Sequence, residues 1–430
     1  MNYHTTALIG IGVLVMLMLL RMPVGYSMLL TGFLGLMYIV SPAAAYNMLG
    51  ADIWEQFSSY SLSVIPLFIL MGSIVFHSGT AEGLYRTAYK WIGHMRGGLA
   101  STTIMASIGF AAICGSNSAS AATIGTLALP QMRKYGYDPA LSAGSVACGG
   151  TLGVIIPPSV TLIVMAIQTE QSVGKLFVAN IIPGVLIGLL FMLTIYLLCL
   201  RKPELGPAGE RYDLKTKIAA LPGTIETLIL FALVIGGLYG GIFTPTEAGA
   251  AGAFGAMAIS LAQRKLSREA FTKAVLETVR ISAMVMVLIT GAVVFGHFLT
   301  ISRLPFFLAD WVAALPVPSF VVLSVIILIY FLGGMFMDAL GFLVVTIPIF
   351  YPLALVLGYD PLWFLVILNV LTTMGAVTPP VGVCAYIVSG LSRHIPLHTV
   401  FKGVMYFLPA YFIVIVILML FPELVTFLAS

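Results

Sequence analysis

Charged side chains are scarce in this sequence. Asp, Glu, Lys and Arg together make up 8% of its 430 residues, whereas hydrophobic residues make up 60% and the mean hydropathy is +1.08. A soluble globular domain usually carries about 25% charged residues, so this composition excludes a soluble protein. The 20 basic residues form no cluster interleaved with aromatic side chains, which argues against nucleic-acid binding.

Cysteine is scarce as well, with four residues in the whole chain: Cys114, Cys148, Cys199 and Cys384. All four lie in apolar segments, and none belongs to a CxxC motif or has a histidine at metal-ligand spacing. Disulfides and transition-metal sites are therefore disfavoured, and we expect small buried side chains at these positions.

The sequence also lacks the motifs of hydrolytic enzymes. It contains no HExxH, no GxSxG and no paired aspartates within apolar segments. The hydroxyls of Ser116 and Ser118 leave an intramembrane hydrolase only as a weak alternative. We expect a protein that is not an enzyme and that needs no organic cofactor.

Long apolar runs make up much of the rest of the sequence. They include Thr5–Leu20, Val64–Phe76, Ile182–Leu200, Thr227–Tyr239, Val321–Leu332 and Phe407–Phe421. Several approach the roughly 20 residues that cross a bilayer as a helix. No basic segment precedes the first run and no small-residue cleavage site follows it, so a signal peptide is disfavoured. The sequence predicts an all-α integral membrane protein.

Several landmarks recur at one offset of 222 residues, which indicates an internal repeat. Gly136–Pro139 recurs as Gly358–Pro361, and the same offset pairs Pro23 with Pro245, Pro130 with Pro352, Gly153 with Gly375, and Pro157–Pro158 with Pro379–Pro380. Chance does not maintain one offset across separate landmarks. The chain is therefore built from two copies of one unit.

The repeat fixes the predicted organisation. The first copy covers 8–206, with a helical hairpin at about 101–133 and a proline-broken helix at about 139–168. A cytoplasmic linker covers 207–229, and the second copy covers 230–428, with its hairpin at about 322–356 and its broken helix at about 361–391. Five crossings per copy would insert the two copies in opposite orientations, the inverted-repeat plan of secondary transporters.

The basic residues predict the orientation in the membrane. With the N-terminus outside, all Lys and Arg residues except Lys175 and Arg303 fall on segments predicted to be cytoplasmic, including Arg393. This bias predicts that both termini are external. Two amphipathic stretches, Glu82–Met95 and Leu304–Leu315, occupy corresponding places in the copies and are either arms joining a mobile part to a fixed part or ordinary interfacial anchors.

The first candidate site is the tip of the first hairpin. Residues Cys114–Thr123 are small and rich in hydroxyl groups, between two apolar segments. Non-helical backbone at membrane depth is tolerated only where it is buried in protein or lines a wet cavity. Its oxygens suit Na⁺, and its helix N-terminus suits a substrate carboxylate. Close helix packing by small residues is the structural alternative.

The second candidate is the break in the following helix, Cys148–Pro158. Proline removes a backbone donor and displaces the carbonyl one turn earlier, so the break leaves oxygens that an ion could satisfy. A simple kink is the alternative interpretation.

The second copy supplies counterparts, a tip at Gly333–Gly341 and a break at Thr372–Pro380. At the repeat offset Asp338 pairs with Ser116. Asp338 is a carboxylate inside an apolar hairpin, where a charge is expensive unless a cation or a proton compensates it. Capping of the return helix is the alternative role and is compatible with ion binding.

Three segments carry a resemblance to a known family. Phe243–Ala250, Ile155–Ser159 and Val377–Gly382 resemble signatures of the large membrane subunit of TRAP (tripartite ATP-independent periplasmic) transporters, and the similarity spans essentially the whole chain. The resemblance implies an elevator-type ion-transporter fold in the bacterial inner membrane. It also implies Na⁺-coupled uptake of an organic acid, with Na⁺ favoured over H⁺. The implied partners are a separate small four-helix membrane subunit and a periplasmic substrate-binding protein.

The resemblance also implies the sites, residue by residue. A first Na⁺ site would use Ser116, Asn117, Ser118, Gly150, Thr151 and Gly153, and a second would use Asp338, Thr373, Gly375 and Thr378. Substrate would lie between the tips, near Ser118, Ser120, Thr123 and Gly341. Several of these contacts would be made by backbone carbonyls.

Two functional alternatives stay open at this stage, a stand-alone ion-coupled carboxylate carrier and a channel. Inverted repeats with half-membrane hairpins also build pores, and only uphill uptake distinguishes a carrier from them. C4-dicarboxylates, sugar acids, sialic acids and ectoine-like solutes are all compatible with the mostly neutral tips.

Overall fold

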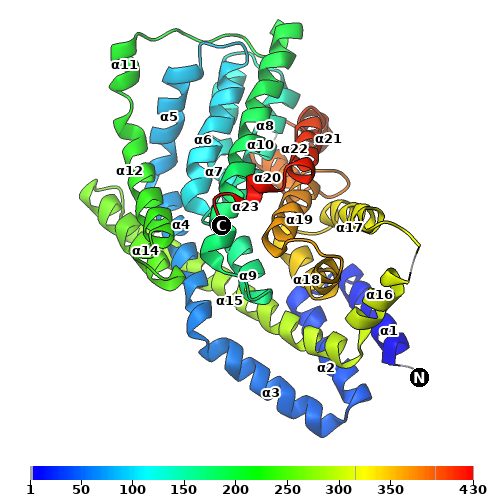
Figure 1. Cartoon of the computed structure of the whole chain (residues 1–430). Coiled ribbons are helices and arrows are strands. Elements are labelled where there is room, and N and C mark those ends of the chain that lie inside the picture. Colours follow the sequence, from blue (N-terminus) through cyan, green and yellow to red (C-terminus); the bar gives the residue numbers. More distant parts are fainter. Residues whose placement is uncertain (1–2, 315, 393, 430) are drawn as a thin grey trace.

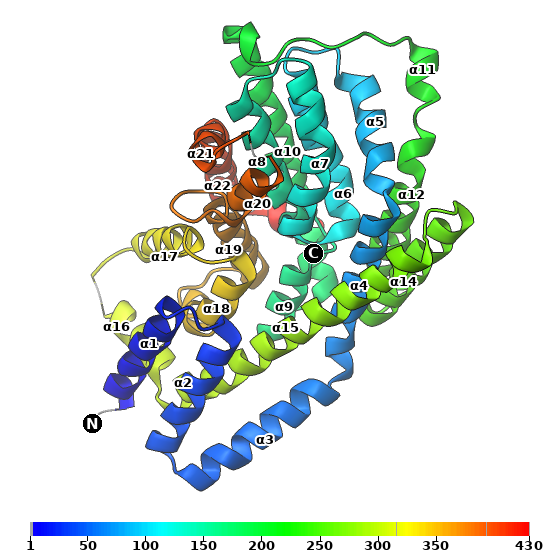
Figure 2. The same ribbon diagram turned by 180° about the vertical axis from the view of Figure 1, so that it is seen from behind.

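The computed structural model describes residues 3–314, 316–392 and 394–429, and within these ranges every regular element is a helix. Figures 1 and 2 show the helices from opposite sides. Leu315 and Arg393, which entered the sequence predictions, lie outside the described residues.

The first copy contains a helical hairpin and a broken helix at the predicted places in the chain. The bounds of its helices are α1 Tyr3–Leu19, α2 Val24–Ile39, α3 Pro42–Ser58, α4 Val64–Ser78, α5 Thr80–Ile92, α6 Gly98–Cys114, α7 Asn117–Lys134, α8 Pro139–Ile155, α9 Val160–Gln168 and α10 Val173–Arg201. Helices α6 and α7 form the first hairpin, and α8 and α9 are the two halves of the broken helix, bent by 40°.

The second copy repeats this order. Its bounds are α12 Pro222–Phe231, α13 Gly237–Tyr239, α14 Pro245–Ala262, α15 Arg268–Ile301, α16 Leu304–Ala313, α17 Ser319–Gly334, α18 Ala339–Val356, α19 Pro361–Gly375, α20 Val383–Leu391, α21 Leu397–Met405, α22 Leu408–Leu420 and α23 Glu423–Thr426. A π-helical turn, Ala232–Gly236, joins α12 to α13. Shifted by 222 residues, α7 covers the bounds of α18, and α2 matches α14 to within one residue.

The copies differ most in α15, a continuous helix of 34 residues. The equivalent segment of the first copy is divided into α3, a 3₁₀ turn at Tyr60–Ser63, and α4. Three serines, Ser59, Ser61 and Ser63, fall in this division, and serine competes with the helix for backbone hydrogen bonds. The sequence analysis missed α3. In Figures 1 and 2, α15 crosses beneath the hairpins and α3 lies alongside it.

Several helices are long and apolar enough to cross a membrane. By length and composition, five of the described helical segments qualify, or seven if each of two bent pairs counts as one span. The bent pairs are α8 with α9 and α21 with α22. Shorter apolar helices include α1, α2, the hairpin helix α6, and α17 and α19 of the second copy. The fold is therefore that of an α-helical membrane protein.

Glycines allow the long helix α15 to pack closely on α2. A Cβ added at Gly25 would lie 2.9 Å from the Cα of Leu288, and one added at Gly32 would lie 2.8 Å from the Cα of Phe295. Such distances leave no room for a side chain, so the two backbones approach directly. Helix α15 of the second copy is thereby packed directly on α2 of the first copy.

The linker packs against the ends of α5 to α8 that lie away from the hairpin tips, and it is shorter than predicted. Helix α12 already begins at Pro222, so the end expected at residue 229 lies inside a helix. The linker contains a short helix α11, Leu214–Ile218. Thr87 of α5 donates a hydrogen bond to the Ala220 carbonyl at 2.7 Å, and Tyr137 donates one to the Pro207 carbonyl at 2.7 Å.

Candidate ion and substrate site

Both hairpin tips are built as helix caps. Ser116 is the N-cap of α7, and its hydroxyl accepts a hydrogen bond from the Ala119 N–H at 3.4 Å. Asp338 is the N-cap of α18, and its Oδ2 accepts from the Leu340 N–H at 3.2 Å. Capping uses one oxygen of the Asp338 carboxylate and leaves the other for a further partner. The capping interpretation of Asp338 is therefore confirmed, and it does not exclude ion binding.

The first tip rests on the break between α8 and α9. The carbonyl of Gly153 would accept from residue 157 in a continuous helix, but Pro157 has no N–H, and the Ile156 N–H is bonded to the Leu152 carbonyl at 2.8 Å. A Cβ added at Gly153 would lie 2.5 Å from the Ser116 carbonyl oxygen and 2.6 Å from the Ser120 hydroxyl. The break and the tip thus bring backbone and hydroxyl oxygens together.

Two polar atoms at the first tip are buried without a hydrogen bond of good geometry among the described residues, the Ser120 hydroxyl, which lies near the Cys114 thiol, and Nδ2 of Asn117. An unpaired buried hydroxyl costs free energy, on the order of 1–3 kcal/mol. Ser120 is fully buried and faces the Gly153 side of the break. Buried polar atoms that lack a protein partner are candidates for pairing with a ligand or with water, so the tip is a candidate binding site.

The next carbonyl freed by the first break has a protein partner. Val154 would pair with residue 158, which is also a proline, and its carbonyl instead accepts from Nδ2 of Asn369 at 3.4 Å. The same Nδ2 group donates to Oδ1 of Asn180 on α10 at 3.1 Å. Both asparagines are fully buried. This pair joins α19 of the second copy to α8 and α10 of the first.

The second tip rests on the break between α19 and α20 in the same way. A Cβ added at Gly375 would lie 2.5 Å from the carbonyl carbon of Gly334, and the Val381 N–H donates to the Met335 carbonyl at 3.3 Å. Here the carbonyls freed by the proline pair have partners. Gly375 accepts from the Thr378 N–H at 2.9 Å, and the carbonyl of the next residue, Ala376, accepts from the N–H of Cys384 on α20 at 3.3 Å.

The two tips face one cavity of about 590 Å³. Ser116, Asn117 and Ser118 line it from the first hairpin, and Asp338 and Leu340 line it from the second. The Asn117 side chain lies close enough to the Asp338 carboxylate to interact with it, although its Nδ2 makes no hydrogen bond of good geometry. Asp338 is solvent-accessible because it opens on this cavity.

The opposite wall of the cavity comes from α4 and α15. It includes Gly72 and Ser73 of α4 and Glu277 of α15, and Nε2 of His77 lies 2.9 Å from Oε2 of Glu277. The described lining contains carboxylates but no Lys or Arg. The sequence analysis missed Glu277. Lys273 and Arg280 flank Glu277 in the charged first turns of α15, so the local sequence does not set it apart as a residue of the cavity.

The structure brings most of the predicted first-site residues together and separates one of them. Gly150 packs against the tip, because a Cβ there would lie 2.6 Å from that of Ala121. Thr151 is fully buried but turns the other way, with its hydroxyl contacting the carbonyl of Cys148 and the hydroxyl of Tyr411 on α22. In this conformation the Thr151 side chain does not reach the tip.

The predicted second-site residues lie on or beside the α19 break. Both threonine hydroxyls donate within their own segment, Thr373 to the Asn369 carbonyl and Thr378 to the Met374 carbonyl, and each oxygen keeps a lone pair. Gly375 lies at the contact with the second hairpin.

Of the predicted substrate residues, Ser118 lines the cavity. Ser120 faces the break, and Thr123 is buried with its hydroxyl donating to the Ala119 carbonyl. Gly341 lies toward Val24 of α2. The described cavity lining contains none of these last three residues.

Relatives of known type match nearly the whole chain. Residues 11–424 match the family model described as the tripartite ATP-independent periplasmic transporter, DctM component. The C4-dicarboxylate TRAP transporter large permease protein DctM of Pseudomonas aeruginosa is 36% identical over 345 residues, which cover 80% of each chain. The isethionate TRAP transporter permease protein DctMQ of Oleidesulfovibrio alaskensis is 37% identical over 341 residues, or 79% of this chain and 54% of that protein.

A solved structure has the same fold. The YdaH transporter of Alcanivorax borkumensis superposes with a TM-score of 0.66, covering 89% of both chains at 16% sequence identity. That likeness concerns the fold alone. The sequence matches go further, since they extend through both hairpins and both proline breaks. The chain therefore belongs to the DctM component family of tripartite ATP-independent periplasmic transporters.

Proposed function

We propose that this chain carries out Na⁺-coupled uptake of an organic acid that a periplasmic binding protein delivers. The observation that carries the proposal is the meeting of two hairpin tips in one cavity, with Ser116 and Asp338 at equivalent positions of the repeat. A broken helix supports each tip. Discontinuous helices at the junction of inverted repeats bind substrate and coupling ion in secondary transporters.

The first Na⁺ site lies between the first tip and the α8 break. Its ligands are the carbonyls of Ser116 and Gly153 and the hydroxyl of Ser120, with Asn117 and Ser118 at the cavity side and Gly150 providing the close approach. The free Gly153 carbonyl and the unpaired Ser120 hydroxyl support this assignment. Ser120 is thereby assigned to the ion rather than to the substrate, and Thr151 contributes no side-chain oxygen.

The second Na⁺ site uses Asp338 with oxygens of Thr373, Gly375 and Thr378. A cation compensates the carboxylate, which has no Lys or Arg beside it in the described cavity lining. Substrate binds between the tips near Ser118, where the N-terminus of α7 favours a carboxylate. The hairpins and broken helices then move together past α4 and α15 in an elevator motion.

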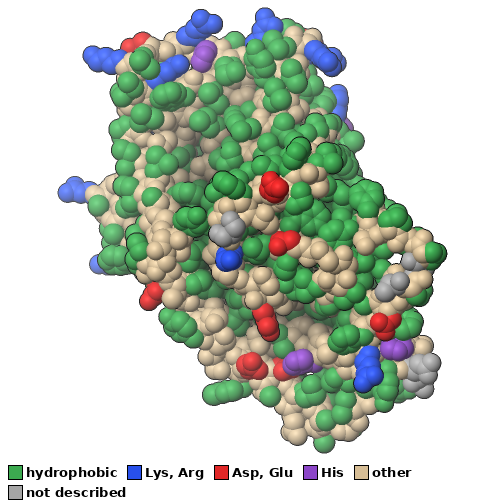
Figure 3. All heavy atoms as spheres, in the orientation of Figure 1, with side chains coloured by type: hydrophobic (Ala, Val, Ile, Leu, Met, Phe, Trp, Pro, Cys, Tyr) green, Lys and Arg blue, Asp and Glu red, His purple; other side chains and the backbone are tan. Residues whose placement is uncertain are grey.

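The working complex contains two further proteins, a separate small four-helix membrane subunit and the binding protein. It lies in the bacterial inner membrane, with both termini of this chain periplasmic. The distribution of charge supports this orientation, because Lys and Arg gather at the end of the molecule where α11 and the linker lie (Figure 3). Basic residues concentrate on the cytoplasmic side of membrane proteins.

Reconstitution in proteoliposomes tests the proposal. The chain is inserted with its small subunit, the binding protein is added outside, and radiolabelled organic acids are offered under an imposed Na⁺ or H⁺ gradient. We expect accumulation against the substrate gradient only with inward Na⁺ and only with the binding protein.

Three results would contradict parts of this function. Uptake that stops at equilibrium indicates a channel, and uptake without the binding protein indicates a stand-alone carrier. Accumulation driven equally well by H⁺ alone contradicts Na⁺ coupling. Liposomes that contain the complex with Asp338→Asn serve as the matched control for leak.

A further inference from the structure

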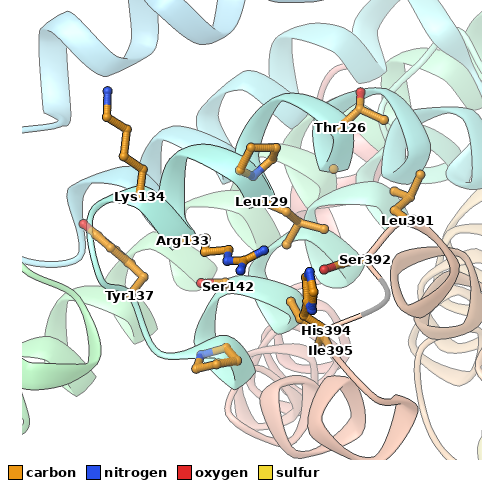
Figure 4. A pocket seen from close by; sticks show the side chains of 13 residues that line it. Thr126, Leu129, Arg133, Lys134, Tyr137, Ser142, Leu391, Ser392, His394 and Ile395 are labelled. Atoms are coloured by element: carbon orange, nitrogen blue, oxygen red, sulfur yellow. The ribbon is translucent and has the colours of Figure 1, made fainter.

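A second cavity, of about 900 Å³, lies away from the hairpin tips, at the base of the first hairpin. Its wall is formed by the last turns of α7, the start of α8, the end of α20 and the connection from α20 to α21. Figure 4 shows the side chains that line it. The cavity therefore lies between the two copies of the repeat, at the end of the molecule where basic residues gather (Figure 3).

The cavity is cationic. Arg133 and Lys134 line it from α7 and His394 from the connection to α21, and its described lining contains no Asp or Glu. Within the described part of the chain, none of the three forms an ion pair. In Figure 4 the Arg133 guanidinium points toward His394 and Ser392, whereas Lys134 extends away from them. A guanidinium turned into a concave wall without a carboxylate leaves its donors for an anion.

Other polar groups of the wall are already engaged. Asp138, which lies beside the wall and does not line the cavity, caps α8 by accepting from the Ala140 and Leu141 N–H groups, both at 2.9 Å. Ser142 donates to the Asp138 carbonyl, and Thr126 donates to the Thr123 carbonyl. Burial raises the pKa of the Tyr137 hydroxyl, which stays neutral and donates to the linker. The donors left for a ligand are those of Arg133, His394, Ser392 and, at the rim, Lys134.

The repeat shows that this arrangement belongs to one end of the molecule. At the 222-residue offset, Arg133 and Lys134 correspond to Leu355 and Val356, and His394 corresponds to Ser172. The base of the second hairpin, which is the equivalent place in the other copy, therefore lacks these three cationic side chains. The architecture of the repeat does not require them.

From this geometry we propose that the cavity binds a phosphate group, held by Arg133 and His394. The floor beside these residues is apolar, with Leu129, Leu391 and Ile395, so it accommodates the carbon atoms attached to the phosphate. An acidic phospholipid of the cytoplasmic leaflet and free cytoplasmic phosphate share this chemistry. Binding at a contact between the two copies stabilises the base of the first hairpin against α20. The inference is independent of the transported substrate.

Titration of the purified complex of the full chain and its small subunit tests the site and identifies the source. The probes are short-chain soluble phosphatidylglycerol, short-chain phosphatidylcholine and inorganic phosphate, with thermal stability and microscale thermophoresis as readouts. Saturable binding of phosphatidylglycerol, with weak binding of the other two, assigns the site to an acidic lipid. Saturable binding of inorganic phosphate at similar affinity assigns it to a soluble anion.

Variants tie the binding to the cavity. Arg133→Gln removes a charge-assisted, two-pronged contact and is expected to weaken the bound probe by about 10-fold or more. Lys202→Gln, an exposed cation of the same end outside the cavity, should change it less than about 2-fold. Thr126→Phe fills the cavity without altering charge and should also abolish binding, which keeps the test valid if Arg133→Gln does not fold. Equal probe affinity in wild type, Arg133→Gln and Thr126→Phe, or no saturable binding of any probe, overturns the proposal.

Discussion

The two hairpin tips occupy equivalent positions but are built from different chemistry. In the first, Ser116 caps the return helix, the Gly153 carbonyl of the supporting break has lost its helical partner, and Ser120 is buried with an unpaired hydroxyl. In the second, Asp338 caps the return helix, and the corresponding Gly375 carbonyl accepts from Thr378. One tip offers neutral dipoles, and the other offers a charge.

The two copies of the repeat therefore share the backbone geometry of the tip and its supporting break, but they do not share the side chains that could bind a ligand. Each tip needs a short polar cap, a glycine where the break touches the hairpin, and a proline pair that ends the supporting helix. Because the Gly375 carbonyl already accepts one hydrogen bond and keeps a single lone pair, the Asp338 carboxylate is the strongest oxygen ligand at the second tip. The ion sites proposed here should therefore differ in affinity and in their response to mutation.

The largest expected effect is at Asp338. Asp338→Asn keeps the size of the side chain and an oxygen for the cap but removes the charge that compensates a cation. We expect Na⁺-driven uptake in proteoliposomes to fall about 100-fold, since the proposed second site loses its charged ligand, and an interaction with a charged group contributes up to about 3 kcal/mol. Asp310→Asn, an exposed carboxylate of α16, should leave uptake unchanged. Undiminished transport by Asp338→Asn, with the same Na⁺ dependence, would refute the role.

Gly153→Ala probes the close contact at the neutral tip. The added Cβ would meet the Ser116 carbonyl oxygen and the Ser120 hydroxyl at 2.5 and 2.6 Å, so the tip must move. Overpacking of this kind costs about 1–3 kcal/mol, and we expect the Na⁺ concentration for half-maximal uptake to rise about 10-fold. Gly12→Ala in α1, where the added Cβ meets nothing within 4 Å, is the matched control. An unchanged Na⁺ dependence in Gly153→Ala would place the ion elsewhere.

Ser120→Ala distinguishes an ion ligand from an unsatisfied hydroxyl. If no ligand uses Ser120, removal of a buried unpaired hydroxyl stabilises the protein and leaves transport unaffected. If Na⁺ uses it, the half-saturating Na⁺ concentration should rise about 3- to 10-fold, and stabilisation by Na⁺ in a thermal melt should decrease. Melting with and without Na⁺, each against K⁺, separates the two cases.

Sequence analysis identified the parts of this site that depend on chain pattern. The 222-residue offset located both tips and both breaks, because glycine, proline and a small polar cap are the residues that such backbone needs. It did not identify α3, since a short run of serines decides whether that segment joins the next helix. It also missed Glu277. This residue lines the cavity only because α15 packs opposite the hairpin tips, and no local pattern encodes that long-range contact.

The direction of the Thr151 side chain could not be predicted from the sequence either, because it also depends on a long-range contact. The resemblance implied Gly150, Thr151 and Gly153 at the first ion site, but neighbouring residues on a helix point about 100° apart. The glycines face the tip, and the Thr151 hydroxyl contacts Tyr411. Only packing against α22 determines which residue of the segment faces which way.

Thr151 therefore gives the smallest expected effect and the sharpest test of the neutral tip. Thr151→Val preserves the shape of the side chain but removes its hydroxyl, and Tyr411→Phe removes the partner from the other side of the same contact. If the contact serves only packing, both variants should lower thermal stability equally, by about 1 kcal/mol, and the half-saturating Na⁺ concentration should move less than 2-fold in either. A rise of about 10-fold in Thr151→Val alone would mean that the threonine turns toward Ser116 when the ion binds. The first site would then contain a side-chain ligand that this conformation holds away from it.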